Sequence, residues 1–186
     1  MEKDYEPSER KNHKMTLLHW LYLLLSAAIL IGLDQWTKLL AIRNLTDGQG
    51  TVTRSIPIIK GVLEFSYVEN TGAAFSMFSG KLVLLVVSTV IVMIYLFFTY
   101  PRIPAGRHYY PIRVIYSMLI AGAIGNMIDR LARKYVVDFI YFKLIDFPVF
   151  NVADIFVTCS VILIALYGFL FYKGEELDFL FHLKQK

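Results

Sequence analysis

Cysteine is nearly absent from this sequence, with Cys159 the only one in 186 residues. A lone cysteine has no intrachain partner, which excludes a disulfide framework. Cys159 lies inside a long apolar run, where a small buried side chain is its expected role. The histidines do not cluster with it at a metal-binding spacing, so we expect no metal and no cofactor. They are His13, His19, His108 and His182.

Charged residues are also scarce, at 18% of positions, whereas hydrophobic residues make up 56% and the mean hydropathy is +0.53. Soluble domains use about 25% charged and roughly 45 to 50% apolar residues. The composition therefore indicates an integral membrane protein. The sequence contains no phosphate-binding loop, internal repeat or low-complexity tract, and we expect no nucleic-acid partner.

Four uncharged runs approach the roughly 20 residues that a membrane-spanning helix needs. They cover about residues 15–33, 82–100, 112–128 and 155–172. The first run is too long for a cleaved signal peptide and lacks a small-x-small cleavage site, so we interpret it as a retained span. We predict an α-helical membrane protein, a four-transmembrane-helix bundle. A single membrane-embedded domain is expected over residues 15–172, between polar tails at residues 1–14 and 173–186.

The segment between the first two spans, about residues 50–80, has a different pattern. Leu63, Phe65 and Tyr67 alternate with polar residues, which is the period of a half-buried strand. Glycine and the turn at Asn70-Thr71-Gly72 bound this run. We predict a small β-sheet on the extracytoplasmic surface.

Basic residues in the short loops indicate the orientation. The link over residues 101–113 holds three arginines and no acid, and the tail before the first span is rich in lysine. Both segments are predicted to be cytoplasmic, and so are both termini. With alternating spans, the ends that carry most polar residues then meet at the outer face. These are Asp34 at the end of span one, Asn126, Asp129 and Arg130 at the end of span three, Asn151 and Asp154 at the start of span four, and Asp138 in the loop joining the last two spans.

Two aspartates in this set are the candidate catalytic residues. Asp138 and Asp154 are flanked by hydrophobic residues, and an ionisable group kept at a bilayer is by default a functional hypothesis. Two carboxylates brought close together cannot both ionise easily, so one keeps a proton while the other accepts one. Such a pair can activate water, although the sequence leaves open which aspartate starts protonated. The alternative for Asp154 is an N-cap on span four, and both roles can hold together.

Asp129 and Arg130 have a simpler interpretation. We favour a role in anchoring the helix end at the headgroup region, because an acid beside a guanidinium stays ionised. Two other protein classes are also open. A transporter or proton channel would hold its acids nearer mid-membrane, and an assembly subunit would not need two convergent carboxylates.

Five strings in this order resemble the lipoprotein signal peptidases, also called signal peptidase II. They are Asp34-Gln35-Trp36-Thr37-Lys38, Glu69-Asn70-Thr71-Gly72-Ala73-Ala74-Phe75, Gly125-Asn126-Met127-Ile128-Asp129-Arg130, Val136-Val137-Asp138-Phe139 and Phe150-Asn151-Val152-Ala153-Asp154. The sequence departs from the family pattern at Lys134, where the family often has glycine.

The resemblance implies a multi-pass aspartyl endopeptidase of the bacterial plasma membrane, active at the extracytoplasmic face. It would cut signal peptides from lipidated precursor proteins, on the amino side of a diacylglyceryl-modified cysteine. Asp138 and Asp154 would be the catalytic dyad, and Asn70, Gly72, Asn126, Arg130 and Asn151 would line the site, with Asp34, Lys38 and Asp129 supporting it. The implied partners are membrane lipid and globomycin-type inhibitors, and we expect a monomer.

Overall fold

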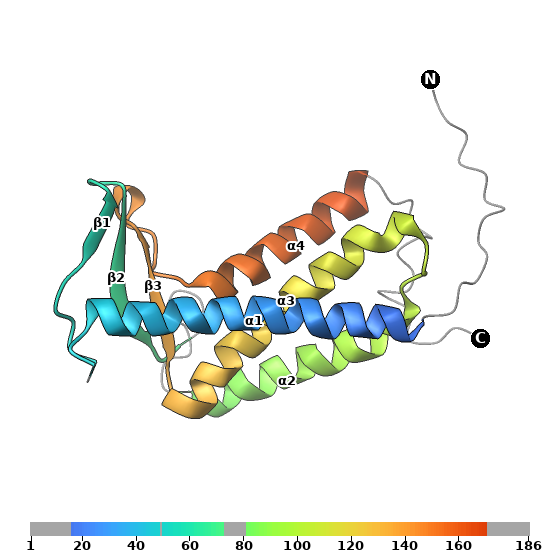
Figure 1. Ribbon diagram of the computed structural model, residues 1–186, viewed down its shortest axis with the longest axis horizontal. Coiled ribbons are helices and arrows are strands. Elements are labelled where there is room, and N and C mark those ends of the chain that lie inside the picture. Colours follow the sequence, from blue (N-terminus) through green and yellow to red (C-terminus); the bar gives the residue numbers. More distant parts are fainter. Residues whose placement is uncertain (1–15, 49, 73–80, 171–186) are drawn as a thin grey trace, which may run out of the picture.

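The computed structural model describes residues 16–48, 50–72 and 81–170. Its elements are α1 (Leu17–Leu45), β1 (Ile56–Ile59), β2 (Leu63–Asn70), α2 (Leu82–Thr99), η3 (Tyr100–Arg102), η4 (Arg107–Tyr109), α3 (Tyr110–Arg133), β3 (Val136–Phe142), η5 (Lys143–Ile145) and α4 (Val152–Leu170). The predicted fold class, a four-helix membrane bundle with a small sheet, is confirmed (Figure 1). The predicted tails and residues 73–80 of the predicted outer segment lie outside the described residues.

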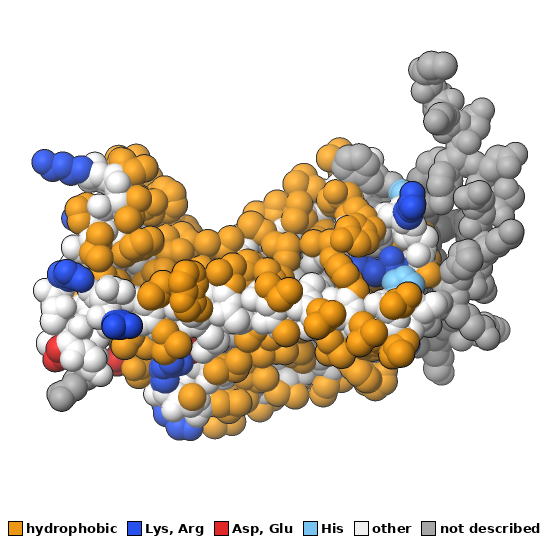
Figure 2. Space-filling model, viewed as in Figure 1, with side chains coloured by type: hydrophobic (Ala, Val, Ile, Leu, Met, Phe, Trp, Pro, Cys, Tyr) orange, Lys and Arg blue, Asp and Glu red, His pale blue; other side chains and the backbone are white. Residues whose placement is uncertain are grey.

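The helices are apolar on the surfaces that face away from the bundle. Within the described ranges, four helices are long and apolar enough to cross a membrane. Ile29 on α1 and Val83 on α2 are 71% and 76% exposed, and Figure 2 shows hydrophobic side chains over most of the length of the bundle. These side chains are placed to contact lipid rather than a protein core.

Helix α1 continues well past the predicted end of the first span. It has 29 residues, which at about 1.5 Å each is longer than the roughly 30 Å hydrocarbon layer. Sequence analysis placed the end of this span before Asp34 because the next residues are polar. Asp34 and Lys38 are fully buried, however, so they face the protein interior and do not end the helix. The extra turns carry α1 up to the sheet (Figure 1).

The sheet has three antiparallel strands in the order β1-β2-β3. Its third strand comes from the segment between α3 and α4, which sequence analysis described only as a loop. In the β2–β3 register, Val68 is opposite Asp138, and the register shifts between Phe65 and Val68. Buried Val137 and Phe139 pack with Ala41 and Leu45 of α1, which fixes β3 against the bundle. Asp138 is therefore held on a paired strand.

Two glycines of α3 allow the neighbouring helices to approach closely. A Cβ atom on Gly122 would lie 2.5 Å from the carbonyl oxygen of Ala153 in α4, and one on Gly125 would lie 2.5 Å from Oδ2 of Asp34 in α1. Any larger side chain at these positions would push α1 or α4 away. The polar residues of α1, the end of α3 and the start of α4 are thus brought together.

Lys134 ends α3 in a left-handed conformation, with φ of 72°. Glycine adopts this conformation without the steric cost that a Cβ imposes. The helix terminus therefore accounts for the glycine that the signal peptidase II pattern often has at this position.

Candidate active site

Asn151 connects the two candidate aspartates. It immediately precedes α4, where its Oδ1 accepts a 2.9 Å hydrogen bond from the backbone N–H of Asp154, and its own N–H donates to Oδ2 of Asp154 at 3.1 Å. This reciprocal pair is a capping box, with Asn151 as the capping residue. The interpretation of Asp154 itself as the N-cap is therefore wrong, because α4 begins two residues before it. Asp154 lies in the first helical turn, with its carboxylate directed back toward the cap.

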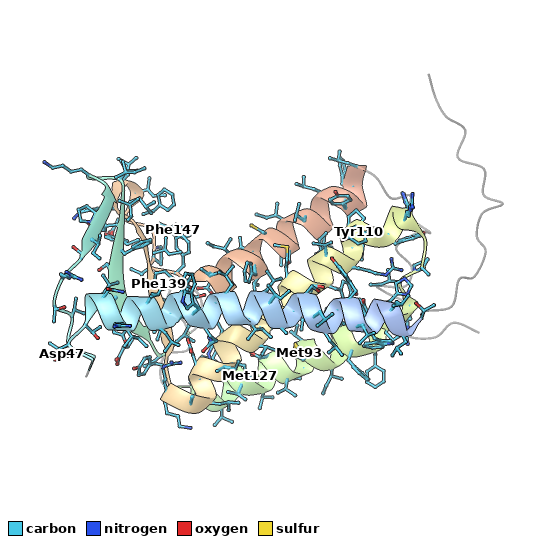
Figure 3. The ribbon with its side chains drawn as sticks, in the orientation of Figure 1. Asp47, Met93, Tyr110, Met127, Phe139 and Phe147 are labelled. Carbon is cyan, nitrogen blue, oxygen red and sulfur yellow. The ribbon has the colours of Figure 1, made fainter. Side chains whose placement is uncertain are left out.

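Asp138 accepts hydrogen bonds from two side-chain amides. Nδ2 of Asn151 donates to its Oδ1 at 2.7 Å, and Nδ2 of Asn70 donates to its Oδ2 at 2.8 Å. Asn70 lies at the end of β2, next to β3 in the sheet. Asp138 is only 2% exposed, so these two amides largely replace water around its carboxylate. Phe139, the residue after Asp138 on β3, and Phe147 are labelled at the sheet end of the bundle in Figure 3.

A third side-chain amide, that of Asn126, donates a hydrogen bond to Asp154. Nδ2 of Asn126, on α3, donates to Oδ1 of Asp154 at 2.7 Å. On its other side, Oδ1 of Asn126 accepts from Nζ of Lys38 at 2.9 Å and from Nδ2 of Asn151 at 3.1 Å. Asn126 thereby links Asp154, Asn151 and the buried Lys38 in one hydrogen-bond network.

All three amides are fixed in the orientation that presents N–H groups to the aspartates. The oxygen of Asn70 accepts from the backbone N–H of Gly72, that of Asn151 from the N–H of Asp154, and that of Asn126 from Lys38. Each of these partners can only donate, so rotating an amide by 180° would place two donors face to face. The site is therefore preorganised for groups that accept hydrogen bonds at positions 138 and 154.

The protonation of Asp138 differs from that of an ordinary aspartate. Burial, followed by the charge of Asp154, raises the pKa of Asp138 to about 7, against the opposing effect of the Asn70 and Asn151 donors. Near neutral pH the pair can hold one proton between its two carboxyl groups. This is the protonation state that acid–base chemistry on a water molecule requires.

A buried ionic network lies behind the amides. Nζ of Lys38 is 2.9 Å from Asp34 and 3.0 Å from Asp129, and all three side chains are fully buried. Arg133 pairs with Asp129 from the partly exposed side, so two carboxylates face two cations. Asp34 also accepts from the backbone N–H of Ala153 at 2.9 Å, and Asp129 from that of Val137 at 3.2 Å. The network thus holds the backbone next to both catalytic candidates.

Arg130 contacts the turn after β2. Its Nη2 donates to the carbonyl oxygen of Gly72 at 3.1 Å, whereas its buried Nε has no hydrogen-bond partner among the described residues. The N–H of Gly72 in turn donates to Asn70. Arg130 therefore positions the turn that fixes Asn70. Within the described residues, the cations paired with Asp129 are Lys38 and Arg133.

The structure brings all ten predicted site residues into this one region. Asn70, Asn126 and Asn151 contact the aspartates, while Asp34, Lys38, Asp129, Arg130 and Gly72 act through neighbours. Sequence analysis did not assign a role to Gln35 or Arg133. Nε2 of Gln35 donates to Oδ2 of Asp34 and to the carbonyl oxygen of Gly125, both at 3.1 Å. The sequence offered one signal for Gln35, which is that it follows Asp34 directly in the first of the five strings.

Comparison with known proteins identifies a family. Residues 26–170 match the family model described as signal peptidase (SPase) II. A lipoprotein signal peptidase of Enterococcus faecalis is 39% identical over 162 residues, which cover 87% of this chain and 96% of the relative. One from Clostridium novyi is 43% identical over 141 residues, covering 73% of this chain and 88% of the relative.

A solved structure gives the same result. A bacterial membrane enzyme determined by the in meso method at 2.3 Å resolution superposes with a TM-score of 0.69 at 32% identity, over 82% of this chain and 92% of that one. The fold and the paired carboxylates define a multi-pass membrane protein with an enzyme-like site at one end of its helical bundle. The chain belongs to the signal peptidase II family, and it is accordingly a peptidase.

Proposed function

We propose that this chain is an aspartyl endopeptidase that removes signal peptides from diacylglyceryl-modified lipoprotein precursors, cutting on the amino side of the lipidated cysteine. The observation that carries the proposal is the pair Asp138 and Asp154, bridged by Asn151 and surrounded by amides fixed as donors. The names of the relatives support the substrate class. The lipid-facing helices around the site support a membrane-bound substrate.

The mechanism is direct attack by water, with no covalent intermediate. The ionised aspartate takes a proton from the water while the protonated one donates a hydrogen bond to the scissile carbonyl. The water oxygen bonds to the carbonyl carbon, the proton taken from water is passed to the amide nitrogen, and the peptide C–N bond breaks to release an amine and a carboxylic acid. Asn70, Asn126 and Asn151 keep the two carboxyl groups oriented throughout, and the Nε–H of Arg130 is a donor available to the substrate backbone.

Lipid recognition gives the test of the substrate class. Each methylene that stays in hydrocarbon contributes about 0.8 kcal/mol, so a few methylenes of the diacylglyceryl group are enough for a roughly 100-fold preference. We expect one precursor to be cleaved on the order of 100-fold faster with its diacylglyceryl group than without it, in the same detergent. Equal cleavage of both forms would refute lipid-dependent recognition while leaving the peptidase assignment intact.

The proton shared by the dyad predicts a pH dependence. The pKa of Asp138 is raised to about 7, so the protonated form persists to neutral pH and is lost above it. We expect kcat/KM to fall by about tenfold for each pH unit above about 7. Replacing Asn70 by alanine removes a donor that lowers this pKa, which should move the alkaline limb to higher pH. A rate that stays constant from about pH 6 to about pH 9 would contradict a protonated dyad.

We further propose that the site faces the extracytoplasmic side and that both termini are cytoplasmic, as the arginines over residues 101–113 suggest. In a Cys159→Ser background, Lys143→Cys beside the sheet should react with an impermeant maleimide in intact cells. Gly106→Cys at the opposite end of the bundle should react only after the cells are opened. Labelling of Gly106→Cys in intact cells would reverse the orientation.

A further inference from the structure

The end of the bundle opposite the dyad contains a separate cavity. It has a volume of about 510 Å³ and lies between the start of α1 and the segment from η4 into α3. The lining residues that matter here are His19, Tyr22, Gly106, Arg107, Tyr110 and Arg113. Tyr110 is labelled at this end in Figure 3. The volume falls within the range of sites for small ligands, roughly 300 to 1,000 Å³.

The charge of this end is of one sign within the described residues. Residues 16–33, 81–128 and 155–170 contain no aspartate or glutamate, and all eight described carboxylates lie elsewhere, toward the dyad and the sheet. Figure 2 shows Lys, Arg and His side chains at this end of the bundle, whereas the Asp and Glu side chains that it shows lie at the sheet end. The cavity is therefore electrostatically complementary to an anion.

Three cationic or donor groups line the cavity. Arg113 is only 3% exposed, and its Nη2 donates to the carbonyl oxygens of Ile103 and Pro104, which hold the guanidinium in the wall. Arg107, in η4, lines the cavity and is exposed. His19 accepts the backbone N–H of Thr16 at its Nδ1, so its neutral ring carries the proton on Nε2. That N–H is a further donor for an anionic ligand.

The remainder of the lining suits a lipid. The rings of Tyr22 and Tyr110 are 5.6 Å apart, and aromatic residues of this kind occupy the headgroup level of a bilayer. Leu18, which also lines the cavity, is 73% exposed on the outward surface of α1. A ligand with a phosphate in the cavity could therefore extend acyl chains along the helix into hydrocarbon.

We propose that this cavity is a binding site for the headgroup of an anionic phospholipid of the phosphatidylglycerol type. The phosphodiester contacts Arg107, Arg113 and His19, and the glycerol lies against the tyrosines. Basic pockets between membrane helices are a recognised way of holding such headgroups. The site is distinct from the dyad and from the lipid of the substrate.

The test uses the full chain reconstituted in nanodiscs that contain equal amounts of phosphatidylglycerol and phosphatidylcholine. Native mass spectrometry then identifies and quantifies the lipid that stays bound to the protein. We expect preferential retention of phosphatidylglycerol, and a loss of at least about tenfold in Arg107→Gln, the effect of removing one charge-assisted hydrogen bond to the phosphate. Arg102→Gln is the matched control, since it removes the same charge at the same end without lining the cavity.

A second variant tests the cavity without changing charge. Nothing lies within 4 Å of a Cβ built on Gly106, so Gly106→Trp can fill the cavity without displacing backbone and should abolish the preference. Gly32→Trp on α1 also has open space and should retain it. Equal retention of both lipids by the unchanged protein would overturn the proposal, as would an equal loss in Arg102→Gln and Arg107→Gln. Preference that appeared only after deletion of the acidic stretch 175–178 would also overturn it, by showing that the chain itself fills the cavity.

Discussion

Asp138→Asn and Asp154→Asn should each lower the cleavage rate of a lipidated precursor by at least about 10³-fold, while the protein still inserts and folds. General acid–base catalysis contributes roughly 10² to 10⁴-fold, and groups that act as a unit lose most of their effect when one is removed. Each replacement keeps the size of the side chain but removes the group that exchanges the proton. The measurement is kcat on a purified lipidated precursor at a fixed detergent concentration.

The orientation of the amides strengthens this expectation. At position 138, an asparagine would direct its own N–H₂ at one of two donors, Asn70 or Asn151, neither of which can rotate without losing its partner. That mismatch costs about 1 to 3 kcal/mol, which lowers the melting temperature without unfolding the protein. The site therefore selects a carboxyl group at this position for structural as well as chemical reasons.

Asp146→Asn is the matched control. Asp146 follows η5 beside the sheet, at the same end of the molecule as the dyad, and accepts a hydrogen bond from the hydroxyl of Tyr141. The change removes one carboxylate near the sheet without touching the network, so turnover should stay within about twofold of the unchanged protein. If either dyad variant retained turnover comparable to that of Asp146→Asn, the catalytic assignment would fail.

The spanning helices could be predicted because they depend on local sequence, and the two aspartates could be proposed as catalytic candidates from the apolar residues that flank each of them. Long apolar runs specify spanning helices wherever they occur. The end of α1 could not be located in the same way, because Asp34 and Lys38 look like a polar terminus unless their burial against α3 is known. Lys38 lies four residues after Asp34, however, so the ion pair between them was accessible from helical spacing.

Strand β3 and the amide orientations depend on contacts between distant segments. The stretch Val136–Phe142 is rich in β-branched and aromatic residues, but its partner β2 is more than 60 residues earlier in the chain. The orientation of Asn70 depends on the backbone N–H of Gly72, and that of Asn126 depends on a lysine 88 residues away. No pattern within one segment specifies which atom of an amide faces an aspartate.

Lys38→Met should both destabilise the protein and reduce catalysis. Removing the ammonium leaves Asp34 and Asp129 fully buried with Arg133 as the remaining cation, and breaking a buried ion pair in this way costs about 3 to 5 kcal/mol. The same change releases Oδ1 of Asn126 from one of its two donors, so the amide that serves Asp154 is less firmly oriented. Thermal unfolding in detergent and kcat on the lipidated precursor report the two effects separately.

Lys143→Met is the matched control, because Lys143 pairs with Glu64 at 3.1 Å with its side chain 53% exposed. An exposed pair contributes about 0 to 1 kcal/mol, so this variant should melt close to the unchanged protein and cleave normally.

The double variant Lys38→Met/Asp129→Asn separates the effect of Lys38 on stability from its effect on the orientation of Asn126. It removes one buried charge of each sign, which should recover much of the lost stability, whereas Asn126 still lacks its lysine and kcat should stay low. Recovery of kcat together with stability would show that Lys38 acts only through the fold, and would remove the orientation of Asn126 from the account of catalysis.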